Sequence, residues 1–394
     1  MTTTTAAATI KTAHFLPYTT IAFLGFLSVG IPLPVLPIEI HAKLGYGAAA
    51  IGVAIGAQSL ATVFTRQLAG HLSDTIGAKK VSMLGLVVAA LVGVVYALSM
   101  RLPLPAPAAF ALMLAARLLL GLAESFYITG CLAWSISMVG VAHSGRAMAW
   151  NGMAMYAAIA FGAPLGTFLY AGWGFLAVAG VTVVLPLMAL PMAMAMVPAP
   201  ISARRGSRSV LGGFIAIWIP GLGMALASSG FGTIAAFLAL RYAESHWAHA
   251  GWALTGFGVA YLAMRLFFAG LPDKLGGKRV VIPCLIVEAA GLVLIWQSVH
   301  PLMALGGAML TGLGYSLVFP SLGVEAVRHL APDNRAMALG AYLACFDIGL
   351  AAAGPIMGTV AGSYGLPSAF LAAACAALLS LAVVVTLLGK NRAV

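Results

Sequence analysis

Residues 70–80 read Gly70-His-Leu-Ser-Asp74-Thr-Ile-Gly77-Ala-Lys79-Lys80, a short polar stretch between two long apolar runs at residues 48–69 and 81–100. Each run is long enough to cross a hydrocarbon core of about 30 Å as a helix of about 20 residues. A related stretch, Asp273-Lys-Leu-Gly276-Gly-Lys278-Arg279, repeats the Asp, the Gly and the basic pair 199 residues later. This recurrence indicates two homologous halves within one membrane protein.

The composition extends this interpretation to the whole chain. Of its 394 residues, 62% are hydrophobic and 7% are charged, against about 25% charged in soluble domains. A soluble enzyme is therefore excluded, and the long unbroken apolar runs exclude a β-barrel. Hydropathy and helix breakers predict twelve spans, at residues 15–38, 48–69, 81–100, 108–131, 147–169, 173–196, 212–240, 251–270, 280–299, 302–323, 336–361 and 366–388.

One polar connection lies at the midpoint of the chain. It runs from Ala199 to Gly213 and contains Arg204, Arg205 and Arg208. It predicts two six-helix domains, residues 1–198 and 214–394, joined by a cytoplasmic linker, residues 199–213. We therefore expect an all-α membrane protein with twelve transmembrane helices in two pseudo-symmetric six-helix bundles.

The net charge of +11 indicates topology and not a nucleic-acid partner, because no basic tract is long enough to follow a phosphate backbone. With a cytoplasmic N-terminus, the basic residues are strongly biased to the cytoplasmic side, as the positive-inside rule requires. Both termini are then predicted to be cytoplasmic. The cytoplasmic group is Lys11, Lys79, Lys80, Arg146, Arg204, Arg205, Arg208, Lys274, Lys278, Arg279, Arg328, Arg335, Lys390 and Arg392, and the outer group is Lys43, Arg101 and Arg241.

The four cysteines lie far apart inside apolar stretches and form no Cys-x-x-Cys or His/Cys cluster: Cys131, Cys284, Cys345 and Cys375. They are best explained as small apolar residues of the helix interiors. We expect no disulfide, no metal site and no cofactor.

Ionisable residues within the spans are costly and are therefore candidates for function. Arg117 and Glu124 lie two helical turns apart on one face of the fourth span, and Asp347 lies eight residues before Pro355 in the eleventh. Glu124 and Asp347 are candidate proton carriers with Arg117 beside them. Structural alternatives are an Arg117–Glu124 ion pair and an Asp347 bonded to a neighbouring helix. Glu288 in the ninth span is a weaker candidate.

Several of these motifs resemble those of the major facilitator superfamily of secondary transporters. The stretch Gly70 to Lys80 resembles its signature loop, and Asp273 to Arg279 its degenerate copy. The segment Arg117-Leu-Leu-Leu-Gly121-Leu-Ala-Glu124 resembles the fourth-span motif of proton-driven members. Two helix-break motifs, Gly162-Ala-Pro164 and Gly354-Pro355, resemble the Gly-Pro motif of antiporters. More closely, residues 30–37, 150–152 and 316–320 resemble the YhhS/YfcJ group.

The resemblance implies a conformational latch between the halves, in which Asp74 accepts hydrogen bonds from the start of the eleventh span. We expect Gly77 to allow a tight turn and Lys79 and Lys80 to anchor at the lipid headgroups. The residues assigned to this latch are Gly70, Asp74, Gly77, Lys79, Lys80, Arg146, Asp273 and Gly276.

The resemblance also implies a monomeric transporter of a bacterial-type inner membrane, not an enzyme, with a small-molecule substrate and protons as partners besides the lipid bilayer. Proton-coupled export of a small organic molecule is the leading hypothesis, and proton-linked uptake of a sugar or organic metabolite is the alternative. Candidate substrate contacts are Asn151, Tyr156, Ser228, Tyr315 and Phe346.

Overall fold

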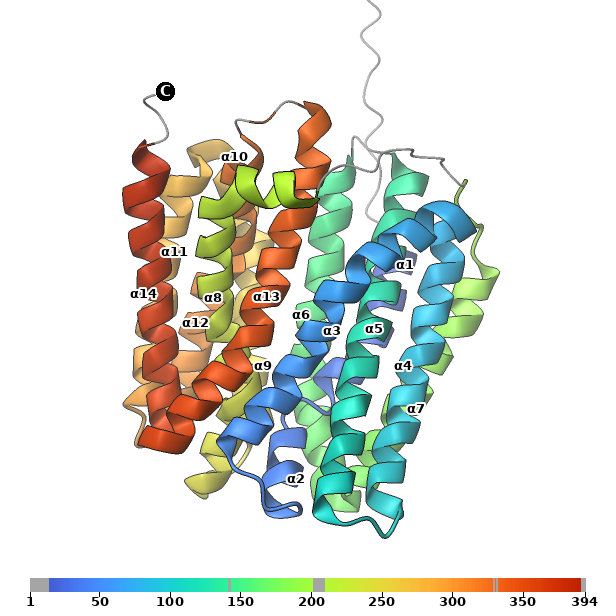
Figure 1. The fold of residues 1–394 in the computed structure, drawn as a ribbon, viewed down its shortest axis with the longest axis vertical. Helices are drawn as coiled ribbons and strands as arrows, with labels where there is room; N and C mark the ends of the chain where they lie inside the picture. The colour runs from blue at the N-terminus through green and yellow to red at the C-terminus, as the bar shows by residue number, and fades with distance from the viewer. Residues whose placement is uncertain (1–13, 141–142, 201–209, 329, 331, 391–394) are drawn as a thin grey trace, which may run out of the picture.

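The computed structural model describes residues 14–140, 143–200, 210–328, 330 and 332–390. In this part of the chain, twelve long helices are accompanied by two short ones, α2 and α10 (Figure 1). The helices are α1 (Leu16–Gly30), α2 (Leu36–Ala42), α3 (Ala48–Leu72), α4 (Ala78–Arg101), α5 (Ala106–Val139), α6 (Ser144–Trp173), α7 (Phe175–Ala195), α8 (Val210–Glu244), α9 (Ala250–Phe268), α10 (Leu271–Leu275), α11 (Gly277–Trp296), α12 (Pro301–Val327), α13 (Pro332–Tyr364) and α14 (Leu366–Lys390).

The predicted spans are confirmed as helices long and apolar enough to cross a membrane. Ten stretches meet that criterion, and one of them, Ala48–Arg101, contains both α3 and α4 joined by the π-helical turn Ser73–Gly77. The apolar helix α1 is shorter, at 15 residues. Together they make the twelve expected spans.

Two bundles lie side by side in Figure 1, with α1–α7 on the right and α8–α14 on the left. We call the end where α1 begins, α7 ends and α8 begins the linker end, and the opposite end the α2 end. Helix α8 begins at Val210, so the last residues of the predicted linker are helical, and residues 201–209 lie outside the described residues. Of the basic residues predicted to be cytoplasmic, Lys11, Arg204, Arg205, Arg208 and Arg392 also lie outside them.

The first span differs from its prediction, because it is interrupted and does not run from residue 15 to 38. Helix α1 ends at Gly30, and α2 begins at Leu36. Pro32 and Pro34 stand in the interruption, where a proline removes a backbone donor and clashes with the preceding turn. The helix of the seventh span is interrupted as well: Ile217 in α8 has non-helical dihedral angles (φ −121°, ψ 16°), three residues before Pro220.

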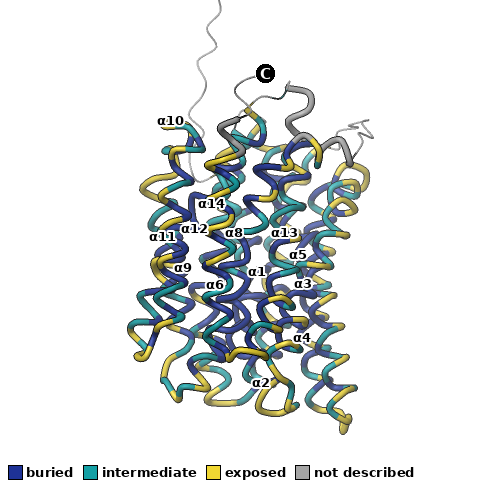
Figure 2. The backbone as a smooth tube through the Cα atoms, turned by 60° about the vertical axis from the view of Figure 1, so that its left-hand side comes forward, coloured by how far each residue is buried: buried dark blue, intermediate teal, exposed yellow. Residues whose placement is uncertain are grey.

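Large apolar side chains cover much of the outer surface, while buried residues concentrate along the central helices (Figure 2). Phe64, Trp173, Leu266 and Phe267 are each more than 60% exposed. Such a surface suits lipid and not water. The chain is therefore a multi-pass membrane protein.

The two bundles meet mainly along two interfaces, α3 against α13 and α6 against α9, with smaller contacts of α2 and α3 on α8. Both are closest toward the α2 end. There Gly52 packs directly on the carbonyl of Gly354, and Gly251 packs on the backbone of Ala163 and Pro164. In Figure 1, α3 and α13 lie close together near the bottom and diverge toward the linker end at the top.

Toward the linker end a groove of about 200 Å³ lies between α1, α6 and α9. Its lining is almost entirely apolar and comprises Thr19, Thr20, Phe23, Trp150, Met153, Ala154, Ala157 and Leu262. Leu262 of α9 is the lining residue that comes from the second bundle, so this groove lies at the boundary between the two bundles. The molecule is thus closed between the bundles at the α2 end and more open at the linker end.

Candidate functional site

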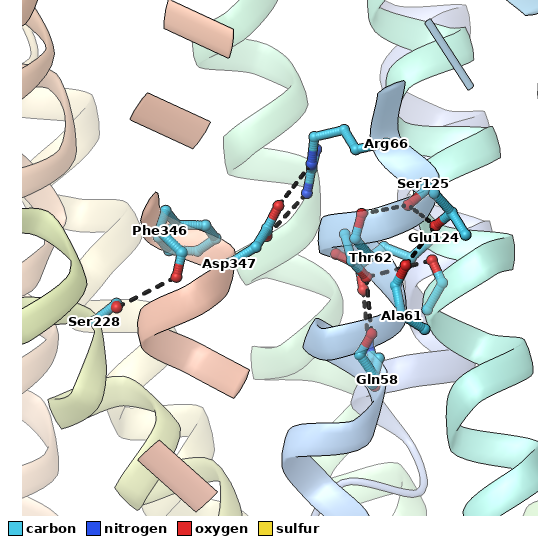
Figure 3. A network of polar contacts seen from close by, with 11 residues as sticks. Gln58, Ala61, Thr62, Arg66, Glu124, Ser125, Ser228, Phe346 and Asp347 are labelled. Atoms are coloured by element: carbon cyan, nitrogen blue, oxygen red, sulfur yellow. Dashed lines mark hydrogen bonds and ion pairs between the residues drawn. The ribbon is translucent and has the colours of Figure 1, made fainter. Parts of the chain in front are cut away.

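An ion pair joins the two bundles in the middle of the α3/α13 interface. Nε of Arg66 donates to Oδ2 of Asp347 at 2.7 Å, and Nη2 donates to Oδ1 at 3.0 Å. This two-pronged geometry is the strongest arrangement of a guanidinium and a carboxylate. Asp347 is only 2% exposed, and Figure 3 shows the pair bridging the gap between α3 and α13.

Glu124 lies on the other side of α3, inside the first bundle (Figure 3). Its Oε2 accepts a hydrogen bond of 2.6 Å from Nε2 of Gln58. Next to it, the hydroxyls of Thr65 and Ser125 are 2.7 Å apart, and the Ser125 hydroxyl also donates to the carbonyl of Thr62 at 3.4 Å. Helix α3 therefore makes polar contacts on two sides. Gln58, Thr62 and Thr65 contact α5, and Arg66 contacts α13.

Electrostatics connects the two carboxyl groups through α3. The charge of Arg66 acts on Asp347 and on Glu124, and the charges of Arg66 and Arg117 both act on Glu124. Glu124 and Asp347 also act on each other. Arg66 therefore attracts both carboxyl groups, and its hydrogen bonds within the described residues go to Asp347.

Arg117 is buried on α5 and bonds to backbone, not to an acid. Its Nε and Nη2 donate to the carbonyls of Ala54 and Ile55, each at 3.3 Å, and Nη1 has no hydrogen-bond partner. Among the described residues, no Arg117–Glu124 ion pair is present. The structural alternative that the spacing left open, a direct pair between these residues, is therefore not what the structure contains.

Two of the candidate substrate residues meet at the α6/α9 interface. The ring of Tyr156 stacks on that of Tyr261, with centroids 3.6 Å apart, and lies edge-on to Tyr315 at 6.4 Å. Phe231 and Phe257 complete a cluster of five rings, in which Tyr156 alone comes from the first bundle. We call these five residues the aromatic cluster.

The other three candidates lie apart from this cluster. The hydroxyl of Ser228 donates to the carbonyl of Ala225 at 2.9 Å and approaches that of Phe346 at 3.4 Å. The ring of Phe346 packs edge-on against Phe319. Asn151 follows Trp150, a residue of the groove, and is partly exposed. The five candidates are thus distributed over the bundle interface and do not form one pocket.

The signature loop has the predicted turn, since Gly77 has φ +100° and its counterpart Gly276 has φ +86°. Both angles favour glycine. Lys79 has a contact that was not predicted: its Nζ donates to the carbonyls of Met194 and Met196, at 2.8 and 2.7 Å, while its position at the lipid headgroups stays a prediction. These carbonyls end α7, where a helix dipole attracts a cation.

The predicted contact of Asp74 with the eleventh span remains a prediction. Asp74 is exposed, as is Asp273 on α10, and the side chains at the start of α13 lie outside the described part of the chain. Gly70 is half-buried in the last turn of α3, and Arg146 lies in the first turn of α6. Lys80 at the start of α4 is exposed.

Both helix-break motifs lie within continuous helices at close helix contacts. Gly354 and Pro355 pack on Gly52 and Gly56 of α3, across the bundle interface. Gly162 of α6 packs on Gly30 at the end of α1, and Pro164 follows it inside α6.

Arg66 lies inside the predicted span 48–69 but was not among the functional candidates selected from the sequence. A signal was present in the repeat. Arg66 recurs as Arg265, and Asp347 and Tyr156 each lie eight residues before the proline of their helix, Pro355 and Pro164. In the internal repeat, Arg265 therefore corresponds to Arg66, and Tyr156 corresponds to Asp347.

The described residues contain no group of three or more His, Cys, Asp or Glu side chains arranged to hold a metal ion.

Comparisons with known proteins agree with this architecture. The family model described as Major Facilitator Superfamily matches residues 18–240 and 221–394. An uncharacterized MFS-type transporter of Salmonella typhimurium is 41% identical over 370 residues, which cover 94% of this chain and 95% of the relative. An uncharacterized MFS-type transporter of Burkholderia mallei is 40% identical over 372 residues, covering 94% and 90%.

Solved structures of the same fold are more distant in sequence. A mutant of the nucleoside transporter NupG has a TM-score of 0.77 at 15% identity, with 94% of this chain and 99% of that chain covered. A bacterial homolog of the human lysosomal transporter Spinster, in an inward-facing and occupied conformation, has a TM-score of 0.76 at 12% identity, with 95% and 96% covered. These similarities show the fold alone.

Proposed function

The chain belongs to the Major Facilitator Superfamily of membrane transporters, and we propose that it is a proton-coupled exporter of a small organic molecule. The observation that carries this proposal is the Arg66–Asp347 pair across the bundle interface, with the buried carboxyl of Glu124 in electrostatic contact with Arg66. We place it as a monomer in a bacterial inner membrane, within the YhhS/YfcJ group of efflux-type members.

The distribution of basic residues supports a cytoplasmic linker end. Lys79, Arg146, Lys278 and Arg328 lie at helix ends on that side, whereas Lys43 and Arg101 end helices on the α2 side. By the positive-inside rule the α2 end then faces outward. The conformation described above is closed to the outside and open toward the cytoplasm.

Glu124 is the proposed proton carrier. In this conformation it is bonded to the neutral amide of Gln58, and a proton on its carboxyl leaves Arg66 free to bond Asp347. Release of that proton to the cytoplasm creates a second anion whose charge attracts Arg66. The Arg66–Asp347 pair is weakened, and the bundles can separate at the α2 end.

The cycle that follows is an exchange. Outside, Glu124 takes a proton from the more acidic medium, the Arg66–Asp347 pair reforms and the α2 end closes. Substrate binds from the cytoplasm after the proton has left. Transport therefore moves protons inward and substrate outward.

The test is the direction of proton movement during substrate movement. Purified protein is reconstituted in liposomes that contain the pH-sensitive dye pyranine, and uridine, glucose, citrate or ethidium is added outside. An exchanger raises the internal pH when a transported compound enters, and Glu124→Gln abolishes this rise. Internal acidification would favour proton-linked uptake, and entry without any pH change would contradict proton coupling.

A further inference from the structure

Glu288 is a buried acid that the proposed cycle does not use. It lies in α11, inside the second bundle, and its relative exposure is 0%. Neither carboxyl oxygen has a hydrogen-bond partner, and no ion pair involves Glu288 among the described residues. It differs in this from Glu124, which is bonded to Gln58, and from Asp347, which is bonded to Arg66.

Two glycines on neighbouring helices make room for this residue. A Cβ atom at Gly230 of α8 would lie 2.5 Å from Oε1 of Glu288, and one at Gly314 of α12 would overlap its backbone. The carboxyl group is thus directed toward α8 at a point without a side chain. The corresponding residue of the first half, 199 positions earlier, is Ala89 of α4, so packing of this helix pair does not by itself require an acid.

Two titratable groups interact with the carboxyl of Glu288. They are the thiol of Cys284, one turn earlier on α11, and the hydroxyl of Tyr315 on α12. The other helices packed on α11 are α8, α10 and α14, and within the described residues they bring no charged side chain to this carboxyl. Asp273 and Lys274 of α10 lie at the linker end of α11, at least 14 residues from Glu288 along the chain, and no ion pair joins them to it. An anion here would be buried without compensation, which costs several kcal/mol.

The aromatic cluster separates Glu288 from the bundle interface. Phe231 of the cluster is adjacent in sequence to Gly230, which faces the carboxyl, and Tyr315 is adjacent to Gly314, which packs on the backbone of Glu288. The hydroxyl of Tyr315 is itself buried without a hydrogen-bond partner. The ring of Tyr156, from the first bundle, lies edge-on to Tyr315. Separation of α6 from α9 would therefore expose Tyr315 and the carboxyl of Glu288 behind it.

We propose that Glu288 is a second proton-binding residue, which holds a proton while the α2 end is closed and exchanges it with water when α6 and α9 separate. On opening, the O–H bond of the carboxyl breaks and the proton passes to water that enters past Tyr315. On closing, the anion must first take a proton from the medium at the α2 end. The inference rests on the proposed proton-coupled function and adds a second coupled proton to it.

The number of protons released on opening is measurable without a substrate. Spin labels at Leu102→Cys and Val299→Cys, exposed positions of the two bundles at the α2 end, report the open-to-closed ratio by pulsed electron resonance. The half-buried Cys345 and the exposed Cys375 are replaced by serine in this background.

Each proton released on opening raises the open-to-closed ratio about tenfold per pH unit. Two protons therefore give about a hundredfold rise per pH unit at the steepest part of the curve of this ratio against pH. We expect Glu288→Gln to reduce the slope to about tenfold per unit. The matched control, Glu325→Gln, alters an acid of the same bundle that bonds the backbone N–H of Lys278 and should keep the steeper slope. An unchanged slope in Glu288→Gln would overturn the inference.

The same assay separates this inference from the proposed function. If Glu124→Gln lowers the pH slope of the open-to-closed ratio and Glu288→Gln does not, only the proposal that Glu288 is a second proton site is contradicted. If Glu288→Gln lowers it and Glu124→Gln does not, the role of Glu124 fails and Glu288 remains. A wild-type ratio that is independent of pH would contradict both.

Modification by dicyclohexylcarbodiimide, which attacks protonated carboxyls in apolar surroundings, provides a measurement on the native acid. The extent of modification at Glu288 is read by mass spectrometry of its peptide. Tyr156→Ala should accelerate modification, whereas Phe168→Ala, an exposed aromatic of the same helix, should not. Equal rates in the two variants would contradict the covering role of the aromatic cluster.

Discussion

The α3/α13 and α6/α9 interfaces are counterparts in the internal repeat, yet they use different chemistry. Arg66 and Arg265 occupy corresponding positions, 199 residues apart. Arg66 forms a two-pronged bond with Asp347 across the interface, whereas Nη2 of Arg265 donates to the hydroxyl of Tyr261 on its own helix, at 2.7 Å. Tyr156 fills the place that Asp347 has in the other half. One interface is therefore ionic and the other aromatic.

The two interfaces of this pseudo-symmetric molecule can therefore respond to protons in different ways. The ionic interface depends on charge, so a nearby proton at Glu124 can weaken or strengthen it. The aromatic interface depends on contact area and on stacking between neutral rings, so protons do not act on its contacts directly. By the inference above, protons act on it through Glu288, which is uncovered as α6 and α9 separate.

The largest effect is expected from a substitution that prevents the close approach of α3 and α13 at the ionic interface. A Cβ at Gly354 would overlap the carbonyl of Gly52, so Gly354→Ala should nearly abolish the closed form at the α2 end. Distances between the labels at positions 102 and 299 measure this loss. A Cβ at Gly362 on the same helix would face open space. Gly362→Ala should therefore leave the stability of the closed form unchanged or raise it by up to about 1 kcal/mol, because alanine has the higher helix propensity. Equal closed populations in both variants would contradict the contact.

The next largest effect is expected from breaking the Arg66–Asp347 ion pair. Arg66→Ala leaves Asp347 buried without a counter-charge, which should cost the closed form about 3–5 kcal/mol relative to the open form, where water reaches the acid. The double variant Arg66→Ala with Asp347→Ala should recover most of the closed population. A double variant as open as the single one would show that the pair acts through packing and not through charge.

A smaller effect is expected at the aromatic interface. Arg265→Met removes one hydrogen bond to the neutral hydroxyl of Tyr261, which is worth about 0.5–1.5 kcal/mol, and leaves no acid unpaired. The closed population should therefore fall less than in Arg66→Met, measured at the same label positions. An equal or larger fall in Arg265→Met would remove the distinction between the two interfaces.

The fold was predictable because length and apolar content determine membrane spans almost alone. Every expected span corresponds to a helix. The interruption between Gly30 and Leu36 falls inside one expected span, residues 15–38, because local sequence shows where prolines stand but not how far the chain unwinds around them. The contact of Lys79 with α7 was missed for a similar reason, since its acceptors lie more than 100 residues away.

The candidate site was predictable in part. Glu124 and Asp347 stood out because acids are costly within spans. Their partners did not, because the Arg66–Asp347 bond joins residues 281 positions apart and depends on how two bundles dock. Tyr156 and Tyr315 were selected, yet the other three rings of the aromatic cluster look like ordinary packing residues until the helices are assembled.

In the proposed cycle, Glu124 is the residue whose proton controls the ionic interface. The decisive measurement is the label separation at the α2 end in wild type and Glu124→Gln, recorded from acidic to alkaline buffer. We predict that alkaline buffer shifts wild type toward the open form, while Glu124→Gln, which mimics the protonated acid, stays more closed and responds less steeply. A Glu124→Gln variant that opens as readily and as steeply as wild type would contradict it.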